Sequence, residues 1–181
     1  MDSFETIVAQ LLIEDGFWVM TSIKVDLTKE EKKKINKPTT PRPEIDIIAF
    51  NLKNNTLFLI EVKSFLDSRG VVLNELQKKS DIQKGRYKLL TSDKYRNIIS
   101  KRLFEDLSKK GLINTKTKIS YGLIAGNIYQ NKEVEIKEYF NNKKWLFWGP
   151  SEIKSKVINL SLKGYENNPV TIASKIILKN W

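Results

Sequence analysis

Two strongly apolar segments, residues 44–50 and 56–64, are separated only by the polar turn Leu52-Lys53-Asn54-Asn55. Short apolar runs rich in β-branched residues and bounded by turn residues predict β-strands. The brief turn predicts that the two strands pair as an antiparallel hairpin. Because both strands are apolar along most of their length, we expect the hairpin to lie at the centre of a covered sheet. The rest of the fold has to be built around it.

The segments on either side of the hairpin predict a mixed α/β fold. Residues 3–15 carry apolar side chains at helical spacing after an Asp-x-x-Glu start of the capping-box type. Residues 17–25 alternate as a strand. The remaining expected elements are helices over 74–90 and 93–110, strands over 118–129 and 145–148, and closing helices over 151–162 and 169–178. The order predicts one domain, 1–181, with a mixed central sheet flanked by helices.

The chain contains neither cysteine nor histidine. Their absence excludes thiol nucleophiles, imidazole bases and zinc sites with sulfur or nitrogen ligands. Catalysis would therefore depend on carboxylates, lysines, hydroxyls and hard metal ions. For phosphodiester chemistry these groups favour Mg²⁺, with Mn²⁺ able to substitute, held by oxygen ligands.

A formal charge of +11 favours a polyanionic partner, although a basic balance is also common in proteins that are merely soluble. Residues 27–43 combine many lysines with three prolines and predict a long, mobile basic loop that becomes ordered on DNA. A solvated face is the competing interpretation of all these charges. The candidate phosphate-binding residues are Lys32, Lys33, Lys34 and Arg42 in the loop, and Lys79, Lys84 and Arg86 after the hairpin.

Three ionisable residues of the hairpin are expected on one face. Opposed residues in an antiparallel pair have numbers with a constant sum, so a turn at 53–54 places Asp46 opposite Glu61. A turn at 54–55 places Asp46 opposite Lys63 instead. Glu61 and Lys63 are two residues apart and share a face in either register.

Two carboxylates among apolar neighbours suffer both desolvation and mutual repulsion. A divalent cation relieves both costs, and phosphodiester hydrolysis needs such an ion together with a nearby lysine. Asp46 and Glu61 are the expected metal ligands, and Lys63 is the expected lysine. The peptide carbonyl of Val62, which lies between them in sequence, is a candidate further ligand.

The segment Pro43-Glu44-Ile45-Asp46, followed after fourteen residues by Glu61-Val62-Lys63, resembles the signature of the PD-(D/E)XK, or restriction-endonuclease-like, nucleases. The resemblance implies an αβββαβ core, here about residues 3–130. It also implies that Asp46 and Glu61 bind the metal while Lys63 assists the attacking water. Members often have a glutamate in the first helix that completes the metal site, and Glu5 occupies a comparable place.

A second motif, Gln83-Lys84-Gly85-Arg86-Tyr87, resembles the Gln-x-x-x-Tyr element of RecB-like members of that family. The resemblance implies that Gln83 and Tyr87 face the hairpin and orient the site or hold substrate. Gly85 is a departure, since glycine is a poor residue for a helix interior. The cysteines that bind an iron–sulfur cluster in some relatives are missing. Residues 145–181 form a C-terminal extension without an assigned role.

Each site residue also has a simpler interpretation. Asp46, Glu61 and Lys63 could form a surface salt bridge worth at most about 1 kcal/mol. Glu5 could serve only in the capping box that begins the first helix. Gln83 and Tyr87 could belong to a helix that packs a tyrosine beside an incidental glutamine.

The expected function is a metal-dependent DNA nuclease, most simply a cytoplasmic endonuclease acting in restriction, phage defence or processing of mobile DNA. Symmetric cutting of a duplex needs two sites, which a homodimer would supply, and a protein partner could provide specificity. The alternatives are a non-catalytic nucleic-acid-binding module, or an RNA-directed or ligand-activated nuclease of the same fold. No apolar run approaches the length of a membrane span, so no membrane association is expected.

Overall fold

The computed structural model describes residues 2–36, 38–39, 41–79, 85–164 and 166–178. Its centre is one five-stranded mixed sheet with strand order β1-β2-β3-β4-β5. The strands are β1 (Trp18–Lys24), β2 (Glu44–Asn51), β3 (Thr56–Lys63), β4 (Lys118–Ala125) and β5 (Leu146–Trp148). The pairs β1–β2 and β2–β3 are antiparallel, whereas β3–β4 and β4–β5 are parallel. The predicted α/β class with a mixed sheet is confirmed.

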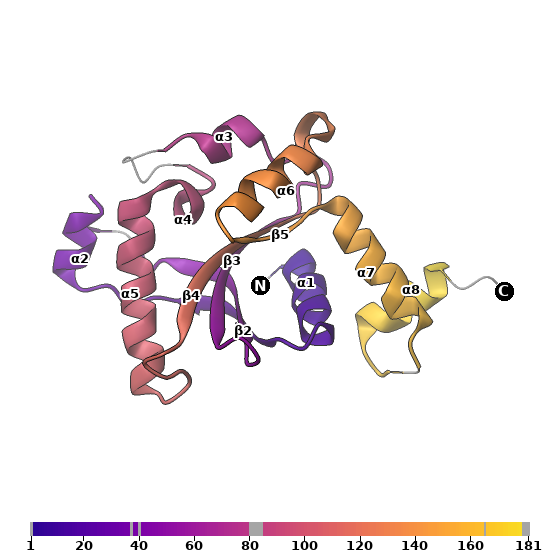
Figure 1. Ribbon diagram of the computed structural model, residues 1–181, viewed down its shortest axis with the longest axis horizontal. Coiled ribbons are helices and arrows are strands. Elements are labelled where there is room, and N and C mark those ends of the chain that lie inside the picture. The colour runs from indigo at the N-terminus through magenta and orange to yellow at the C-terminus, as the bar shows by residue number, and fades with distance from the viewer. Residues whose placement is uncertain (1, 37, 40, 80–84, 165, 179–181) are drawn as a thin grey trace.

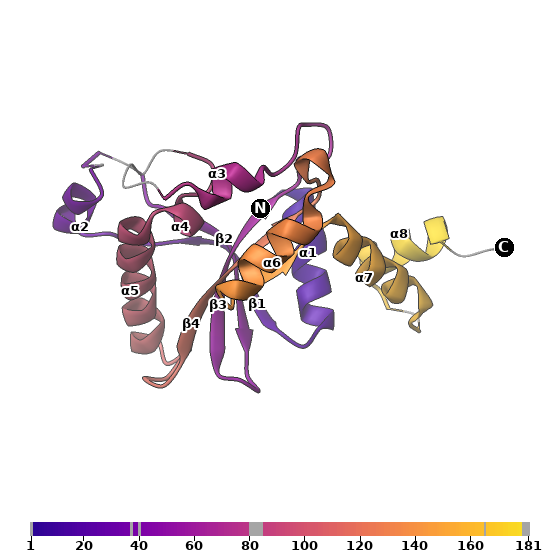
Figure 2. The ribbon, with the colours of Figure 1, turned by 45° about the horizontal axis from the view of Figure 1, so that its top comes forward.

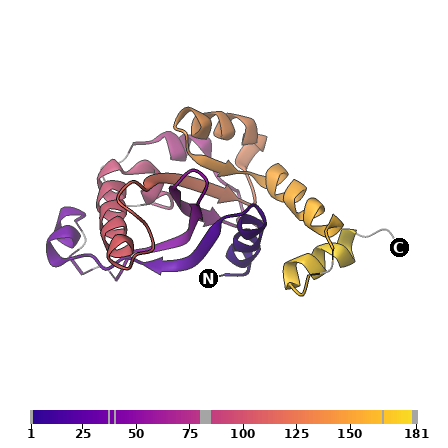
Figure 3. The same cartoon turned by 60° about the horizontal axis from the view of Figure 1, so that its bottom comes forward.

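Helices lie on both faces of this sheet (Figure 1). They are α1 (Ser3–Glu14), α2 (Lys29–Lys34), α3 (Leu73–Gln77), α4 (Lys88–Thr91), α5 (Asp93–Lys109), α6 (Glu133–Asn142), α7 (Pro150–Leu162) and α8 (Pro169–Leu178), with a 3₁₀ turn η1 (Tyr129–Asn131). The sheet is seen between α1 and α5 when the bottom of the molecule is turned forward (Figure 3). Helices α7 and α8 extend away from the sheet at the C-terminal end.

The hairpin β2–β3 is covered on both faces, as its apolar sequence predicted. Ile47 and Ile60 pack with α1 on one face, whereas Ile48 and Leu59 pack with α5 on the other. These side chains are at most 3% exposed. Burial on two faces accounts for the near-absence of polar residues in the middle of the two strands.

A third apolar cluster lies beyond the hairpin on the α5 face of the sheet. It joins β4 and β5 to α3, α4 and α6, with Ile136 and Phe140 of α6 fully buried. The view turned so that the top comes forward shows α3, α4 and α6 along this side (Figure 2). Helix α6 was not predicted, because its sequence is mostly charged and polar.

The basic loop predicted over 27–43 contains a helix. Thr28 and Glu31 form a capping box at the start of α2, and the three lysines at its end suit the negative pole of the helix dipole. Ile35, directly after α2, is fully buried in the cluster under α5. The expectation of an unstructured loop overlooked both the capping box and this apolar anchor.

The single helix predicted over 74–90 is also wrong. Helix α3 ends at Gln77, α4 begins only at Lys88, and residues 80–84 lie outside the described residues. Gly85 has φ of +123°, a conformation that glycine tolerates and other residues rarely adopt. Strand β4 is shorter than predicted and ends at Ala125. Among the described residues, no helix has the length and apolar character needed to cross a membrane.

Candidate active site

The paired part of the β2–β3 hairpin ends at Ile47, next to Asp46. Ile47 pairs with Ile60, which is the register that places Asp46 opposite Glu61. Past this pair, the Val62 N–H donates a hydrogen bond of 2.8 Å to the Asp46 carboxylate oxygen Oδ2. The carboxylate thus takes the place that a backbone carbonyl would have had, and the two strands separate there.

The sheet is distorted at the level of Asp46. In a regular strand Ile45 and Ile47 would share a face, yet Ile45 packs under α5 while Ile47 packs under α1. On the neighbouring strand, the residue opposite Asp46 by register is Ser22, whose φ is +54°. A non-glycine residue in this region costs about 1–3 kcal/mol, and such residues cluster at functional sites. Asp46 therefore lies where the regular alternation of β2 side chains between the two faces of the sheet is interrupted.

Lys63 lies between the two carboxylates. Its Nζ is 3.4 Å from Asp46 Oδ2 and 3.3 Å from Glu61 Oε1. The three side chains are each only about one-fifth exposed, with values of 20%, 22% and 18% for Lys63, Asp46 and Glu61. The predicted convergence of these three residues is present in the structure, and it is more enclosed than a surface salt bridge.

Burial raises the pKa of the Glu61 carboxyl above its ordinary value, and the charge of Asp46 raises it further. The Lys63 ammonium only partly offsets this. Burial alone would lower the pKa of Lys63, but the two carboxylates outweigh burial and raise it. Lys63 is thus held as a cation beside a carboxylate that is poorly stabilised in its ionised form. A second cation near Glu61 would favour that ionised form.

Glu5 lies in the first turn of α1 and takes part in its capping box. The Glu5 N–H donates to Asp2 Oδ1 at 2.7 Å, and the Asp2 N–H donates to Glu5 Oε2 at 3.2 Å. Burial raises the Glu5 pKa, and the charge of Asp46 is the second cause. Glu5 therefore lies within electrostatic range of Asp46. The two hydrogen bonds between Glu5 and Asp2 belong to the helix cap.

The Val62 carbonyl is oriented towards the opening between the strands. In an extended strand the N–H and C=O of one residue point to the same side, and the Val62 N–H points to Asp46. The next carbonyl, that of Lys63, points the other way and accepts a hydrogen bond from Gly126 N on the β4 side. The predicted oxygen ligand thus lies on the same side as the Asp46 carboxylate.

Of the second motif, Gln83 lies outside the described residues. Tyr87 directly precedes α4 and is buried, only 4% exposed, in the cluster with α3 and α6. Burial raises its pKa to about 12, with smaller contributions from neighbouring charges that include Lys63 and Glu61. Tyr87 is thus near the site, but its ring lies in the core, and Gly85 and Arg86 directly before it are not helical.

The predicted phosphate-binding residues are dispersed. Arg42 lines a cavity that Glu61 also lines, and its guanidinium pairs with Asp26 at 3.3 Å. Arg86 lies over the Phe65 ring. The three lysines of α2 lie on the far side of α5 from α1 (Figure 1). Lys79 is exposed after α3, and Lys84 lies outside the described residues.

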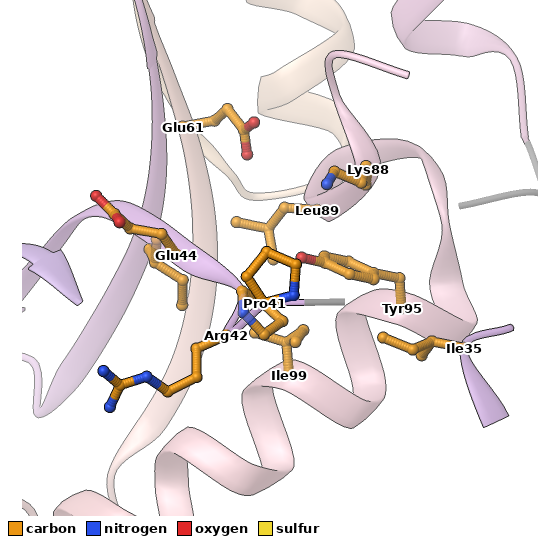
Figure 4. Close-up of a pocket in the computed structure, with 11 residues that line it drawn as sticks. Ile35, Pro41, Arg42, Glu44, Glu61, Lys88, Leu89, Tyr95 and Ile99 are labelled. Atoms are coloured by element: carbon orange, nitrogen blue, oxygen red, sulfur yellow. The ribbon is translucent and has the colours of Figure 1, made fainter. Parts of the chain in front are cut away.

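The cavity beside Glu61 also brings in two residues that the sequence did not single out as site residues (Figure 4). Lys88 lies at the start of α4, and its positive charge lowers the pKa of Glu61. Its Nζ lies 5.5 Å from the centre of the Tyr95 ring. Tyr95 lies in the first turn of α5 among apolar core residues. Lys88 is one of many lysines and arginines in the chain. Nothing in the sequence distinguishes Tyr95 from its core neighbours.

The donor chemistry of the site suits a hard divalent cation. Asp46 and Glu61 present carboxylate oxygens and Val62 a carbonyl, the ligand types that Mg²⁺ and Mn²⁺ prefer. Among the described residues there is no group of three or more acidic side chains close enough to hold a metal ion. Glu5 therefore does not form a carboxylate triad with Asp46 and Glu61. A cation here would depend on the two hairpin carboxylates, the carbonyl and water.

Comparison of the chain with protein-family models, with curated proteins and with solved structures found no match.

Proposed function

We propose that this protein is a metal-dependent nuclease of the restriction-endonuclease-like type that hydrolyses phosphodiester bonds in DNA. The observation that carries the proposal is the cluster of Asp46, Glu61 and Lys63, with both carboxylates within 3.4 Å of the lysine where the central hairpin opens. These side chains are enclosed, and Glu61 is poorly stabilised as an anion. An arrangement that costs stability is expected where function requires it.

The order of the elements supports the same proposal. Helix α1, strands β1, β2 and β3, helix α5 and strand β4 follow one another as α-β-β-β-α-β, with short helices inserted between them. That is the order expected for a restriction-endonuclease-like core, and the cluster lies on its second and third strands. Strand β5 and helices α6, α7 and α8 would then be additions to the core.

In this proposal Asp46, Glu61 and the Val62 carbonyl hold one Mg²⁺. The bound ion supplies charge stabilisation at the phosphate and lowers the pKa of its water. Lys63, protonated because both carboxylates raise its pKa, donates hydrogen bonds to the attacking water or to a non-bridging phosphate oxygen. Asp46 also holds the strand opening in shape through its bond from the Val62 N–H.

DNA is the proposed substrate because the chain is strongly basic and has cations beside the cluster. The net charge is +11, and Lys88 and Arg42 line the cavity that adjoins Glu61. Neutralising phosphates with such residues releases counterions and favours binding of any strand. A binding module without catalysis would use the same charges but would gain nothing from the enclosed carboxylates.

The proposal is tested by incubating the protein with plasmid, linear duplex DNA, single-stranded DNA and RNA in Mg²⁺, Mn²⁺ or EDTA. We expect cleavage of DNA only with metal, and a loss of at least ~100-fold in Glu61→Gln and Lys63→Met. Glu138→Gln and Lys53→Met, which alter exposed residues of the same types, should cleave normally. DNA binding without cleavage in every metal would favour the binding module, and cleavage of RNA alone would reassign the substrate.

A further inference from the structure

A cavity of about 260 Å³ adjoins Glu61 on the α5 face of the sheet. It lies between the start of β2, the first turns of α4 and α5, and the segment that leads into β2 (Figure 4). Pockets for drug-sized ligands span roughly 300–1,000 Å³, so this one has room for a single small ring system.

Its lining combines apolar side chains with four charged ones. In the view of Figure 4, Leu89 lies above Pro41 and Ile99 below it, and the fully buried Ile35 lies on the side of Tyr95. A heterocyclic ring with polar edges needs both kinds of contact, apolar side chains for its faces and polar groups for its edges. The charged groups at its rim come from Glu44, Glu61, Lys88 and Arg42.

One polar group points into the cavity itself. Tyr95 is only 6% exposed, yet its hydroxyl points into the space between Leu89 and Pro41 (Figure 4). This hydroxyl has no hydrogen-bond partner among the described residues. The hydroxyl is open to the cavity, so the polar edge of a bound ligand can become its hydrogen-bond partner.

A cation lies between this cavity and the hairpin carboxylates. The Lys88 ammonium lies over the Tyr95 ring, and its positive charge lowers the pKa of Glu61. A phosphate joined to a ring in the cavity would reach Lys88 on the side that faces Glu61. The cavity therefore matches one nucleotide, with its base inside and its phosphate towards the proposed metal site.

We propose that the cavity binds one unstacked nucleobase of the strand being cut, so that the preferred substrate has an unpaired nucleotide next to the cleaved bond. The inference rests on the proposed nuclease function. A base inside a duplex is stacked and paired, and moving it into a pocket costs a few kcal/mol. Single strands, flaps and mismatches avoid most of that cost, so they should bind better than a continuous duplex.

The test measures binding rather than cleavage. The Asp46→Asn variant, in Ca²⁺, is titrated with oligonucleotides that carry 2-aminopurine, a fluorescent base, in a single strand, in a mismatch or in a perfect duplex. We expect the unpaired probes to bind more tightly and to change fluorescence more than the duplex. Adding Tyr95→Phe, which removes only the hydroxyl, should weaken binding of unpaired probes by about 2–10-fold and leave duplex binding unchanged.

Two further variants complete the test. Leu89→Phe narrows the cavity and should remove the preference for unpaired probes, whereas Tyr121→Phe is a matched control because Tyr121 packs against Trp145 and does not line the cavity. Equal binding of paired and unpaired probes, or no effect of Tyr95→Phe, would overturn the proposal. Free nucleoside monophosphate binding in the cavity as tightly as the oligonucleotide would assign it to a mononucleotide instead.

The outcome also separates this inference from the proposed function. Cleavage of duplex and single strands alike, with Tyr95→Phe unaffected in binding, would leave the nuclease intact and remove the base pocket. Selective binding of unpaired bases without cleavage in any metal would keep the pocket and reject the nuclease.

Discussion

At the scale of single residues, the main feature is the enclosure of three charges at one point of distorted sheet. Asp46 lies where the regular alternation of β2 side chains is interrupted, opposite Ser22 with its left-handed backbone. A structural salt bridge needs no such distortion, and Lys63 alone does not return the Glu61 pKa to its ordinary value. The cluster is thus better explained by a function than by a contribution to stability.

This view predicts that Glu61→Gln stabilises the metal-free protein. Because burial and Asp46 raise the folded-state pKa of Glu61 above 4.5, the folded state binds this proton more tightly than the unfolded state. The contribution of Glu61 to stability is therefore present below pH 4.5 and is lost as the pH rises through the raised pKa. In EDTA at pH 8 the variant should have the higher Tm.

The comparison is made by thermal unfolding at pH 8 and at pH 4.5, with Glu138→Gln as the control. The advantage of Glu61→Gln should shrink at the lower pH, because a raised folded-state pKa means that less of the folded wild-type protein carries the buried charge there. A variant that is less stable than the wild type at pH 8 would mean that the Lys63 ion pair is a net stabilising contact.

The sequence was enough to predict that Asp46, Glu61 and Lys63 lie close together, because side chains alternate between the two faces of a strand. It also limited the hairpin to two registers, of which the Ile47–Ile60 pair selects one. Tyr95 could not be found in that way, since its place in α5 is that of a core residue. Only the packing of distant segments around its hydroxyl distinguishes it.

At the scale of elements, prediction succeeded where a local signal was strong. The capping box of α1 and the apolar runs of β2 and β3 gave elements within a residue or two of those observed. Prediction failed for elements whose formation depends on packing against distant parts of the chain. Helix α6 depends on two buried residues, Ile136 and Phe140, in a charged sequence, and α2 depends on Ile35 packing under α5.

Helix α2 presents the lysines Lys32, Lys33 and Lys34 next to α5. If this helix contacts DNA, changing all three to glutamine should weaken binding and reduce the slope of log affinity against log salt by about 2–3. The measurement is a salt titration of binding to a labelled oligonucleotide by the Asp46→Asn protein. An unchanged slope would exclude α2 from the interface.

A matched control removes the same charge elsewhere. Lys109, Lys110 and Lys116 are exposed at the C-terminal end of α5 and in the loop after it, at the opposite end of that helix from the cavity. Their replacement by glutamine should change the slope much less than the α2 variant does.

At the scale of the whole molecule, one sheet carries the proposed site and helices enclose it. Helix α1 brings Glu5 to one side of Asp46, while α4 and α5 bring Lys88 and Tyr95 to the other side. The site therefore depends on the complete packing of both faces, and a cation bound there should stabilise the entire fold.

Metal binding should accordingly raise the Tm. At a Mg²⁺ concentration 100-fold above the Kd, the folded state gains about 2.7 kcal/mol, which corresponds to roughly 5–10 °C for a domain of this size. Asp46→Asn and Glu61→Gln should show little of this shift, and KCl at equal ionic strength controls for charge screening. An equal shift in the wild type and both variants would place the metal elsewhere.

The most direct test of the nuclease assignment is cleavage of an end-labelled single-stranded oligonucleotide by the wild type and by Asp46→Asn, each in Mg²⁺ and in EDTA. Asparagine keeps an oxygen that can accept the Val62 N–H bond, so the variant should fold and bind DNA. We predict cleavage by the wild type in Mg²⁺ alone, with the other three samples inactive. Equal cleavage by Asp46→Asn, or by the wild type in EDTA, would contradict the assignment.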